Sequence, residues 1–223
     1  GPLAGVKILD LSTVVLGPYA TQLMGDMGAD VIKIEQPGEG DPMRQWGQGA
    51  KPAWWRTIAR NKRSVALNLR LERGQQIARD LIAQADILIE NFRPGTLEKW
   101  NLGWDRLHAV NTRLIMIRVS GYGQTGPYAA RAGFGAIGEA MGGLRHVVGD
   151  PGSPPARVGI SIGDSLAATF ACVGALAALH HREQTGQGQV VDSAIYEAVL
   201  GMMESLVTEY DKAGFIRERT GAI

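Results

Sequence analysis

The stretch VKILDLSTVVLGPYATQLMGDMGADVIKIE, residues 6–35, contains the pattern that decides the fold. Its two ends, residues 6–11 and 30–35, are short apolar runs, as expected of parallel strands that are buried on both faces. Between them, residues 18–27 are expected to form a helix, since a Gly-Pro pair marks its start and Gly28 its end. The stretch therefore predicts a strand, a helix and a second strand in succession.

The remaining chain repeats this alternation of short apolar runs and longer helical patterns. Further strands are predicted at residues 64–69, 86–91, 114–120 and 157–162. Further helices are predicted at residues 72–84, 164–183 and 194–212. Residues 36–60 show no clear periodicity and are predicted to form a long loop. This order predicts an α/β fold with helices flanking an open parallel sheet, and no linker divides residues 1–223 into two domains.

The composition excludes several classes of protein. The 223 residues include 23 Lys and Arg against 22 Asp and Glu, and a net charge of only +1 does not draw the protein to nucleic acid or to an anionic membrane. The single cysteine, Cys172, cannot form an internal disulfide, and the four histidines show no metal-binding spacing. No uninterrupted apolar stretch approaches the roughly 18 residues of a membrane span, and a signal-peptide pattern is missing. We therefore expect a cytoplasmic protein without a bound metal, with Cys172 in its core.

Asp164 is the carboxylate in the most informative position. It follows a predicted strand and Gly163, and it stands at the expected start of a long apolar helix. An Asp in such a position commonly caps the helix by accepting hydrogen bonds from its first free N–H groups. The same position suits a nucleophile, because a helix N-terminus lowers the pKa of a carboxylate and a preceding Gly lets a substrate approach. The two roles are compatible, and local sequence alone favours the cap.

Two further motifs lie where predicted strands end. Ligands of open α/β sheets bind at the carboxyl ends of the strands, and the segment NFRPG, residues 91–95, occupies such an end. Arg93 would there face a phosphate or carboxylate, although a plain turn with Arg93 in solvent is the simpler explanation. Residues 121–126, GYGQTG, nearly match the GxGxxG pattern of dinucleotide sites, but Pro127 follows instead of a helix. We interpret this segment as a cluster of turns.

Seven segments spread over the whole chain form a specific combination. They are LAGVKILDLS from residue 3, GPYATQLMGDMGADVIKIEQPGEGDPMR from 17, RNKRSVALNL from 60, ENFRPG from 90, SGYGQTGP from 120, GDSLA from 163 and TGQGQVVDSAIYEA from 185. With them the chain resembles the N-terminal portion of the class III CoA-transferases, which include formyl-CoA and carnitine CoA-transferases and the α-methylacyl-CoA racemases. The resemblance implies a Rossmann-like open parallel sheet flanked by helices, the first part of the family's large domain.

The resemblance also implies roles for single residues. Asp164 corresponds to the catalytic aspartate, whose carboxylate forms first an aspartyl anhydride with the acyl group and then a thioester with CoA. Contacts with CoA, which is a substrate, are implied for Leu67, Arg70, Asn91, Phe92, Arg93 and Lys99. A small carboxylic acid is the second substrate, and no permanently bound cofactor is expected. Residues 133–143 and the helix start at Asp164 are candidate sources of N–H donors for the tetrahedral intermediates.

The chain departs from the family in two respects. Family members are nearly twice as long and carry a small second domain after the point where this chain stops, so residues 1–223 are expected to belong to a longer protein. The family's interlocked dimers imply a homodimer for that full-length protein. Racemases carry a catalytic histidine where this chain has Phe134, and racemisation needs both a base and an acid. A CoA-transferase is therefore predicted, and the alternatives are a racemase-like enzyme and a CoA-binding fragment without activity.

Overall fold

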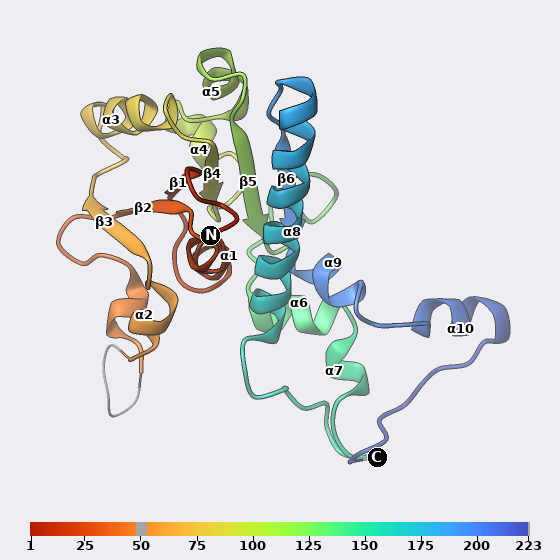
Figure 1. Ribbon diagram of the computed structural model, residues 1–223. Coiled ribbons are helices and arrows are strands. Elements are labelled where there is room, and N and C mark those ends of the chain that lie inside the picture. The colour runs from red at the N-terminus through yellow and green to blue at the C-terminus, as the bar shows by residue number, and fades with distance from the viewer. Residues whose placement is uncertain (48–52, 223) are drawn as a thin grey trace.

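A parallel sheet forms the centre of the protein. The computed structural model describes residues 1–47 and 53–222, and within them six strands pair in the order β3-β2-β1-β4-β5-β6 (Figure 1). The strands are β1 (Lys7–Asp10), β2 (Asp30–Glu35), β3 (Lys62–Ala66), β4 (Ile87–Glu90), β5 (Ile115–Ser120) and β6 (Val190–Ala194). All neighbouring strands run parallel. The order is that of doubly wound nucleotide-binding sheets, so the predicted Rossmann-like α/β fold is confirmed.

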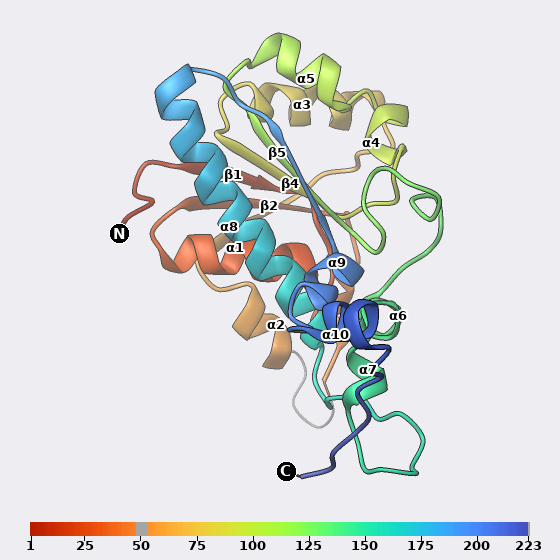
Figure 2. The same ribbon diagram turned by 90° about the vertical axis from the view of Figure 1, so that its right-hand side faces the viewer.

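Helices cover both faces of this sheet (Figure 2). They are α1 (Leu16–Asp26), α2 (Ala53–Ile58), α3 (Glu72–Ile82), α4 (Thr96–Lys99), α5 (Trp104–Val110), α6 (Gly135–Met141), α7 (Leu144–Val147), α8 (Ile162–Thr185), α9 (Ile195–Leu200) and α10 (Leu206–Ala213), with a short 3-10 helix η1 (Pro42–Gln45). One core joins α1 and α8 to Ile87 and Ile89 of β4. The other joins α3, α4 and α5 to Leu88. Strand β4 is therefore buried on both faces, as its continuous apolar run predicts.

Helix α8 is long because it crosses the whole face of the sheet. Its buried side is lined with small residues: Ala167, Ala168, Ala171, Ala175 and Ala178. These let the helix pack close to the strands, and Cys172 is buried beside them, as predicted. With a mean hydropathy of 1.7 over an 18-residue window, α8 is long and apolar enough, by length and composition alone, to cross a membrane, although it contains no uninterrupted apolar run of about 18 residues. A core helix passes the same test, so the absence of a membrane partner stays a prediction.

The segment that precedes α8 differs from the prediction. The sequence predicts a strand at residues 157–162, but the structure forms none there, and α8 already begins at Ile162. Gly159 has a φ of 90°, which lies in the left-handed region and is incompatible with a continuous strand. Val158 and Ile160 are exposed, so their apolar character does not come from burial in the sheet. Asp164 consequently follows an irregular loop and not a strand.

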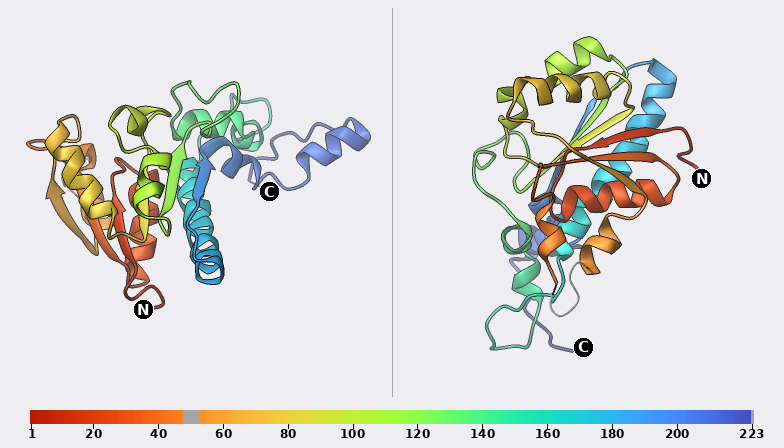
Figure 3. Two further views of the ribbon diagram at one scale, coloured as in Figure 1. Left: turned by 90° about the horizontal axis from the view of Figure 1, so that it is seen from above. Right: turned by 90° about the vertical axis from the view of Figure 1, so that its left-hand side faces the viewer.

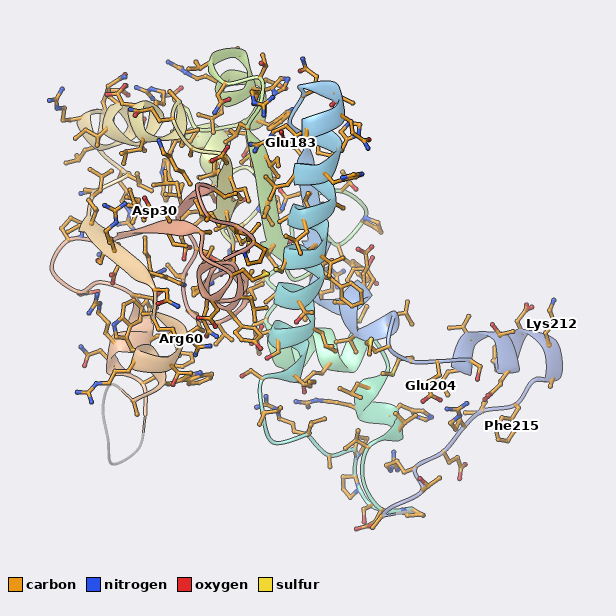
Figure 4. The ribbon with its side chains drawn as sticks, viewed as in Figure 1. Asp30, Arg60, Glu183, Glu204, Lys212 and Phe215 are labelled. Atoms are coloured by element: carbon orange, nitrogen blue, oxygen red, sulfur yellow. The ribbon has the colours of Figure 1, made fainter. Side chains whose placement is uncertain are left out.

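Other boundaries differ for local reasons. The helix predicted at residues 194–212 is two helices, α9 and α10, and Glu204 between them has a positive φ of 52° (Figure 4). Strand β6 precedes them and was not predicted. Helix α10 extends away from the sheet, and Lys212 and Phe215 lie on this projecting arm (Figures 3 and 4). The predicted loop at residues 36–60 contains η1 and α2, while its residues 48–52 lie outside the described residues.

Candidate active site

The loops after β1 and β4 are joined at the carboxyl edge of the sheet. These strands are neighbours, yet α1 covers one face after β1 and α4 covers the other after β4. The side chain of Asn91 accepts a hydrogen bond from Thr13 N at 2.8 Å and donates one to Thr13 O at 2.7 Å. Asn91 therefore holds the two loops together at the topological switch point, where open α/β sheets bind their ligands.

A buried ionic cluster of Asp10, Lys33, Asp41 and Lys62 contacts and supports the loop after β1. Lys33 Nζ lies 3.1 Å from Asp41 Oδ2 and 3.9 Å from Asp10 Oδ2, and Lys62 Nζ lies 3.2 Å from Asp10 Oδ2. Burial alone would raise the pKa of Asp10, but the charges of the two lysines hold that pKa at about 2. Asp41 also accepts a hydrogen bond from the N–H of Val14, whose φ of 67° is unfavourable for a β-branched residue. The cluster thus fixes a strained turn at the carboxyl edge.

Asp164 lies in the first turn of α8 but does not cap it. The capping position is occupied by Ser161, so the prediction of a helix cap at Asp164 is wrong. Within residues 1–47 and 53–222, no group donates a hydrogen bond to its carboxylate. A Cβ atom placed on Gly135, the first residue of α6, would come within 2.8 Å of Asp164 Oδ2. Only a glycine lets the backbone of α6 approach the carboxylate this closely.

A second carboxylate, Glu139 of α6, is fully buried near Asp164, and neither of its oxygens has a hydrogen-bond partner among the residues described. Two arginines of the described residues form long ion pairs with it, with Arg157 Nη2 3.6 Å from Oε1 and Arg145 Nε 3.8 Å from Oε2. Burial, and then the charge of Glu139, raise the pKa of Asp164 to about 6, while Arg157 opposes them. The pKa of Asp164 is therefore raised overall, and not lowered as its place at a helix N-terminus predicts.

The transfer mechanism predicted from the sequence gives Glu139 no role, although an acidic residue inside the apolar stretch GAIGEAM (residues 135–141) is a detectable signal. Gly163 also has a packing role. A Cβ atom there would lie 3.1 Å from both the carbonyl oxygen of Gly135 and Cγ2 of Ile195, so this glycine lets α8 pack closely against α6 and α9. Phe134, directly before α6, is 61% exposed and carries no group that can move a proton.

A cavity of about 690 Å³ opens beside the first turn of α8. Tyr19 of α1 and Trp54 of α2 line one side, and Ser161 and Ser165, which flank Asp164 in sequence, line the other. Arg157 contributes a cation to the same wall. One cation, four hydroxyl groups and two aromatic side chains line this pocket together with aliphatic side chains, and it has room for a small organic acid.

The residues implied to bind CoA surround two smaller hollows at the same edge of the sheet. Leu67, Arg70 and Phe92 line a hollow of about 140 Å³, together with Trp100, whose ring lies 5.1 Å from that of Phe92. Asn91, Phe92 and Arg93 line one of about 60 Å³. Lys99 lines neither hollow; it lies on α4, exposed, next to Trp100. The structure thus brings five of the six residues together, with Phe92 shared between the hollows.

Two further predictions concern the segment at residues 121–126 and the absence of a metal site. Residues 121–126 form turns, and the next helix is α6, so the interpretation as a cluster of turns is confirmed. Gly121 and Gly133 are in close backbone contact, which brings this cluster against the segment leading to α6. Among the residues that the structure describes, no group of three or more His, Cys, Asp or Glu side chains could hold a metal ion.

Named relatives with similar sequences are CoA-transferases. The succinyl-CoA–D-citramalate CoA-transferase of Chloroflexus aurantiacus is 58% identical over 225 residues, which cover 100% of this chain and 56% of that protein. The β subunit of the succinyl-CoA–L-malate CoA-transferase of the same organism is 47% identical, over 99% of this chain and 56% of the relative. The human succinyl-CoA:glutarate CoA-transferase is 36% identical, over 94% and 48%. The chain spans about half the length of these relatives.

A solved structure and a family model agree with these sequences. The crystal structure of a CAIB/BAIF family protein from Brucella suis superposes with a TM-score of 0.94 at 36% identity, covering 99% of this chain and 60% of that one. The model described as CoA-transferase family III matches residues 3–223. The chain therefore belongs to CoA-transferase family III, as its seven sequence segments predict.

Proposed function

We propose that this chain carries the nucleophile of a CoA-transferase, which moves CoA between an acyl-CoA thioester and a carboxylic acid. The observation that carries the proposal is the Asp164 carboxylate, which lies against the backbone of Gly135 and accepts no hydrogen bond from any described residue. Its lone pairs are therefore available for attack. A pKa of about 6 leaves it ionised at neutral pH and more basic than an exposed aspartate.

The proposed reaction proceeds through two kinds of covalent intermediate on Asp164. The carboxylate attacks the thioester carbonyl, the C–S bond breaks, and CoA thiolate leaves an acyl-aspartyl anhydride. The thiolate then attacks the aspartyl carbonyl, which releases the first acid as a carboxylate and forms an aspartyl-CoA thioester. The second acid attacks this thioester to give a new anhydride and CoA thiolate. Attack of the thiolate on the new acyl carbonyl yields the product thioester and restores Asp164.

The substrates proposed are short dicarboxylic acids and their CoA thioesters. The relatives are named for succinyl-CoA together with D-citramalate, L-malate or glutarate, which are all acids with two carboxyl groups. The cavity beside the first turn of α8 supports the same class, since its wall contains a cation and hydroxyl groups. Because the chain spans about half of these relatives, the activity of the whole protein is part of the proposal.

CoA is proposed to bind across the two hollows that share Phe92. Arg70 and Arg93 are exposed there and form no ion pair with a described residue, so both can meet phosphate groups. We expect Arg70→Ala to weaken CoA binding by about 10-fold or more in calorimetry at low salt, and by less at high salt. Arg73→Ala, which removes an exposed cation of α3 outside both hollows, is the control. Equal affinities of the two variants would contradict the placement of CoA.

The intermediate provides the test of the proposed function. After incubation of the intact protein with succinyl-CoA, we expect a mass increase on the peptide that contains Asp164, and hydroxylamine should remove it, because anhydrides and thioesters both react with this nucleophile. A racemase would instead exchange the α-proton of a 2-methylacyl-CoA with deuterium oxide. Such exchange without an adduct would overturn the proposal. Binding of CoA without either reaction would leave the fragment without activity as the remaining interpretation.

A further inference from the structure

We infer that Arg157 binds the second, non-reacting carboxylate of a dicarboxylic substrate in the cavity beside the first turn of α8, and so selects diacids over monoacids. The inference rests on the proposed function and adds to it a specificity residue. None of the segments that carry the family resemblance contains Arg157, which lies in the irregular loop between α7 and α8.

Arg157 lies between the cavity and the two carboxylates of the site. Its side chain is half exposed and lines the cavity, on the same wall as Ser161. Its guanidinium also lies 3.6 Å from Glu139 and is close enough to Asp164 to act on the charge of that group. Asp164 itself does not line the cavity, but Arg157 borders both the cavity and the carboxylates. A diacid with one carboxyl carbon at Asp164 therefore has this cation close by for its other end.

Most N–H groups of the Arg157 guanidinium are available for a ligand. It donates to the carbonyl of Ile160 at 3.5 Å, and its separation from Glu139 exceeds hydrogen-bond distance. Arg118, by contrast, donates to two carboxylates at 2.7 and 2.8 Å. An arginine presents five N–H groups in a planar fork that matches a carboxylate, so Arg157 can bind a ligand without breaking a strong existing pair. Tyr19 and Ser161 line the same cavity, and their hydroxyl groups are candidate additional donors.

An alternative role for Arg157 is to neutralise the buried charge of Glu139. A second arginine, Arg145, allows the two roles to be distinguished. Arg145 faces the same carboxylate at 3.8 Å but does not line the cavity. If both arginines only balance the buried charge, removing either one should affect all substrates alike. If Arg157 binds the distal carboxylate, its removal should affect only those substrates that have one.

The experiment compares succinyl-CoA with butyryl-CoA, which has the same chain length and ends in a methyl group. In the intact protein, the rate of adduct formation at Asp164 is measured for both thioesters, and the affinity for free succinate is measured by calorimetry. We expect Arg157→Gln to lower the succinyl-to-butyryl ratio of kcat/KM by about 10-fold to 100-fold and to weaken succinate binding. Arg157→Lys should recover part of the ratio, since it keeps the charge but loses the fork. Arg145→Gln should leave the ratio unchanged.

The outcomes separate this inference from the proposed function. An unchanged ratio in Arg157→Gln, with adducts still formed, would overturn the inference and leave the nucleophile in place. An equal fall of the ratio in Arg145→Gln would assign both arginines to Glu139 and would also overturn it. If no adduct forms but succinate binding depends on Arg157, the proposed reaction fails while the diacid site stands. Because Arg157 is on the surface, a thermal-unfolding midpoint close to that of the unmodified protein confirms that each variant is folded.

Discussion

Replacing Asp164 with alanine in the intact protein is expected to lower the rate of CoA transfer by on the order of 10⁴-fold or more, because the variant has no group to carry the acyl and CoA intermediates. The variant should remain folded. Burial raises the pKa of Asp164, so its ionised form is less stable in the folded protein than in the unfolded chain. Removing this carboxylate should therefore not reduce the free energy of unfolding at neutral pH.

The control for this variant is Asp105→Ala, which removes another aspartate from the first turn of a helix, α5. Loss of a first-turn carboxylate costs up to about 1 kcal/mol of stability through the helix dipole and should leave the transfer rate unchanged. In the unmodified protein, the rate should fall as the pH decreases through about 6, since the protonated form of Asp164 cannot attack. An active Asp164→Ala variant would exclude this residue as the nucleophile.

Replacing Lys33 with methionine is expected to destabilise the protein by about 3–5 kcal/mol, because the change leaves Asp10 and Asp41 buried without their shared cation. Lys33 is 1% exposed, so water cannot replace its charge. Denaturant unfolding monitored by circular dichroism measures the loss. The pH dependence gives a second measurement. In the unmodified protein, the pKa of Asp10 at about 2 contributes stability that is lost as the pH falls from about 4 toward 2. In the variant this loss should begin at a higher pH.

Arg63→Met is the matched control for Lys33→Met. Arg63 lies on β3, beside Ile32 of β2, and its partner Asp30 is 2.6 Å away, but both side chains are well exposed. An exposed pair of this kind contributes at most about 1 kcal/mol, because solvent screens it. A loss for Lys33→Met no larger than that for Arg63→Met would show that the buried cluster does not stabilise the fold.

The sequence predicts the centre of the sheet better than its margins. β2 is predicted at its observed residues, and β4 and β5 to within one residue at each end, because strands buried on both faces leave continuous apolar runs. β6 is missed because it is an edge strand, and its sequence VVDSA mixes polar and apolar residues. The strand predicted at residues 157–162 fails because its apolar residues are exposed and Gly159 turns the chain. An apolar run in the sequence therefore predicts a strand correctly only where its side chains are buried in the sheet.

The site shows a similar division. Asp164 is recognisable from its motif, but its elevated pKa depends first on burial and then on the charge of Glu139. Glu139 lies 25 residues earlier in the sequence and comes close to Asp164 only through the packing of α6 against α8. A local sequence pattern cannot predict a contact between residues this far apart in the sequence. The same holds for the cavity, since its walls come from α1, α2 and the start of α8. Residue types therefore identify the nucleophile, while the charges and shape around it require the folded chain.

The buried ionic cluster also has a consequence for how the sheet assembles. Asp10, Lys33 and Lys62 belong to three neighbouring strands, β1, β2 and β3, so their charges meet only when all three have paired. A shift of β2 by one residue would turn Lys33 to the opposite face of the sheet and leave Asp10 without one of its two cations. An apolar core accepts such a slip more readily, because one hydrophobic side chain can substitute for another. The cluster therefore favours the observed register of β1, β2 and β3 over shifted registers. The same register positions the loop after β1.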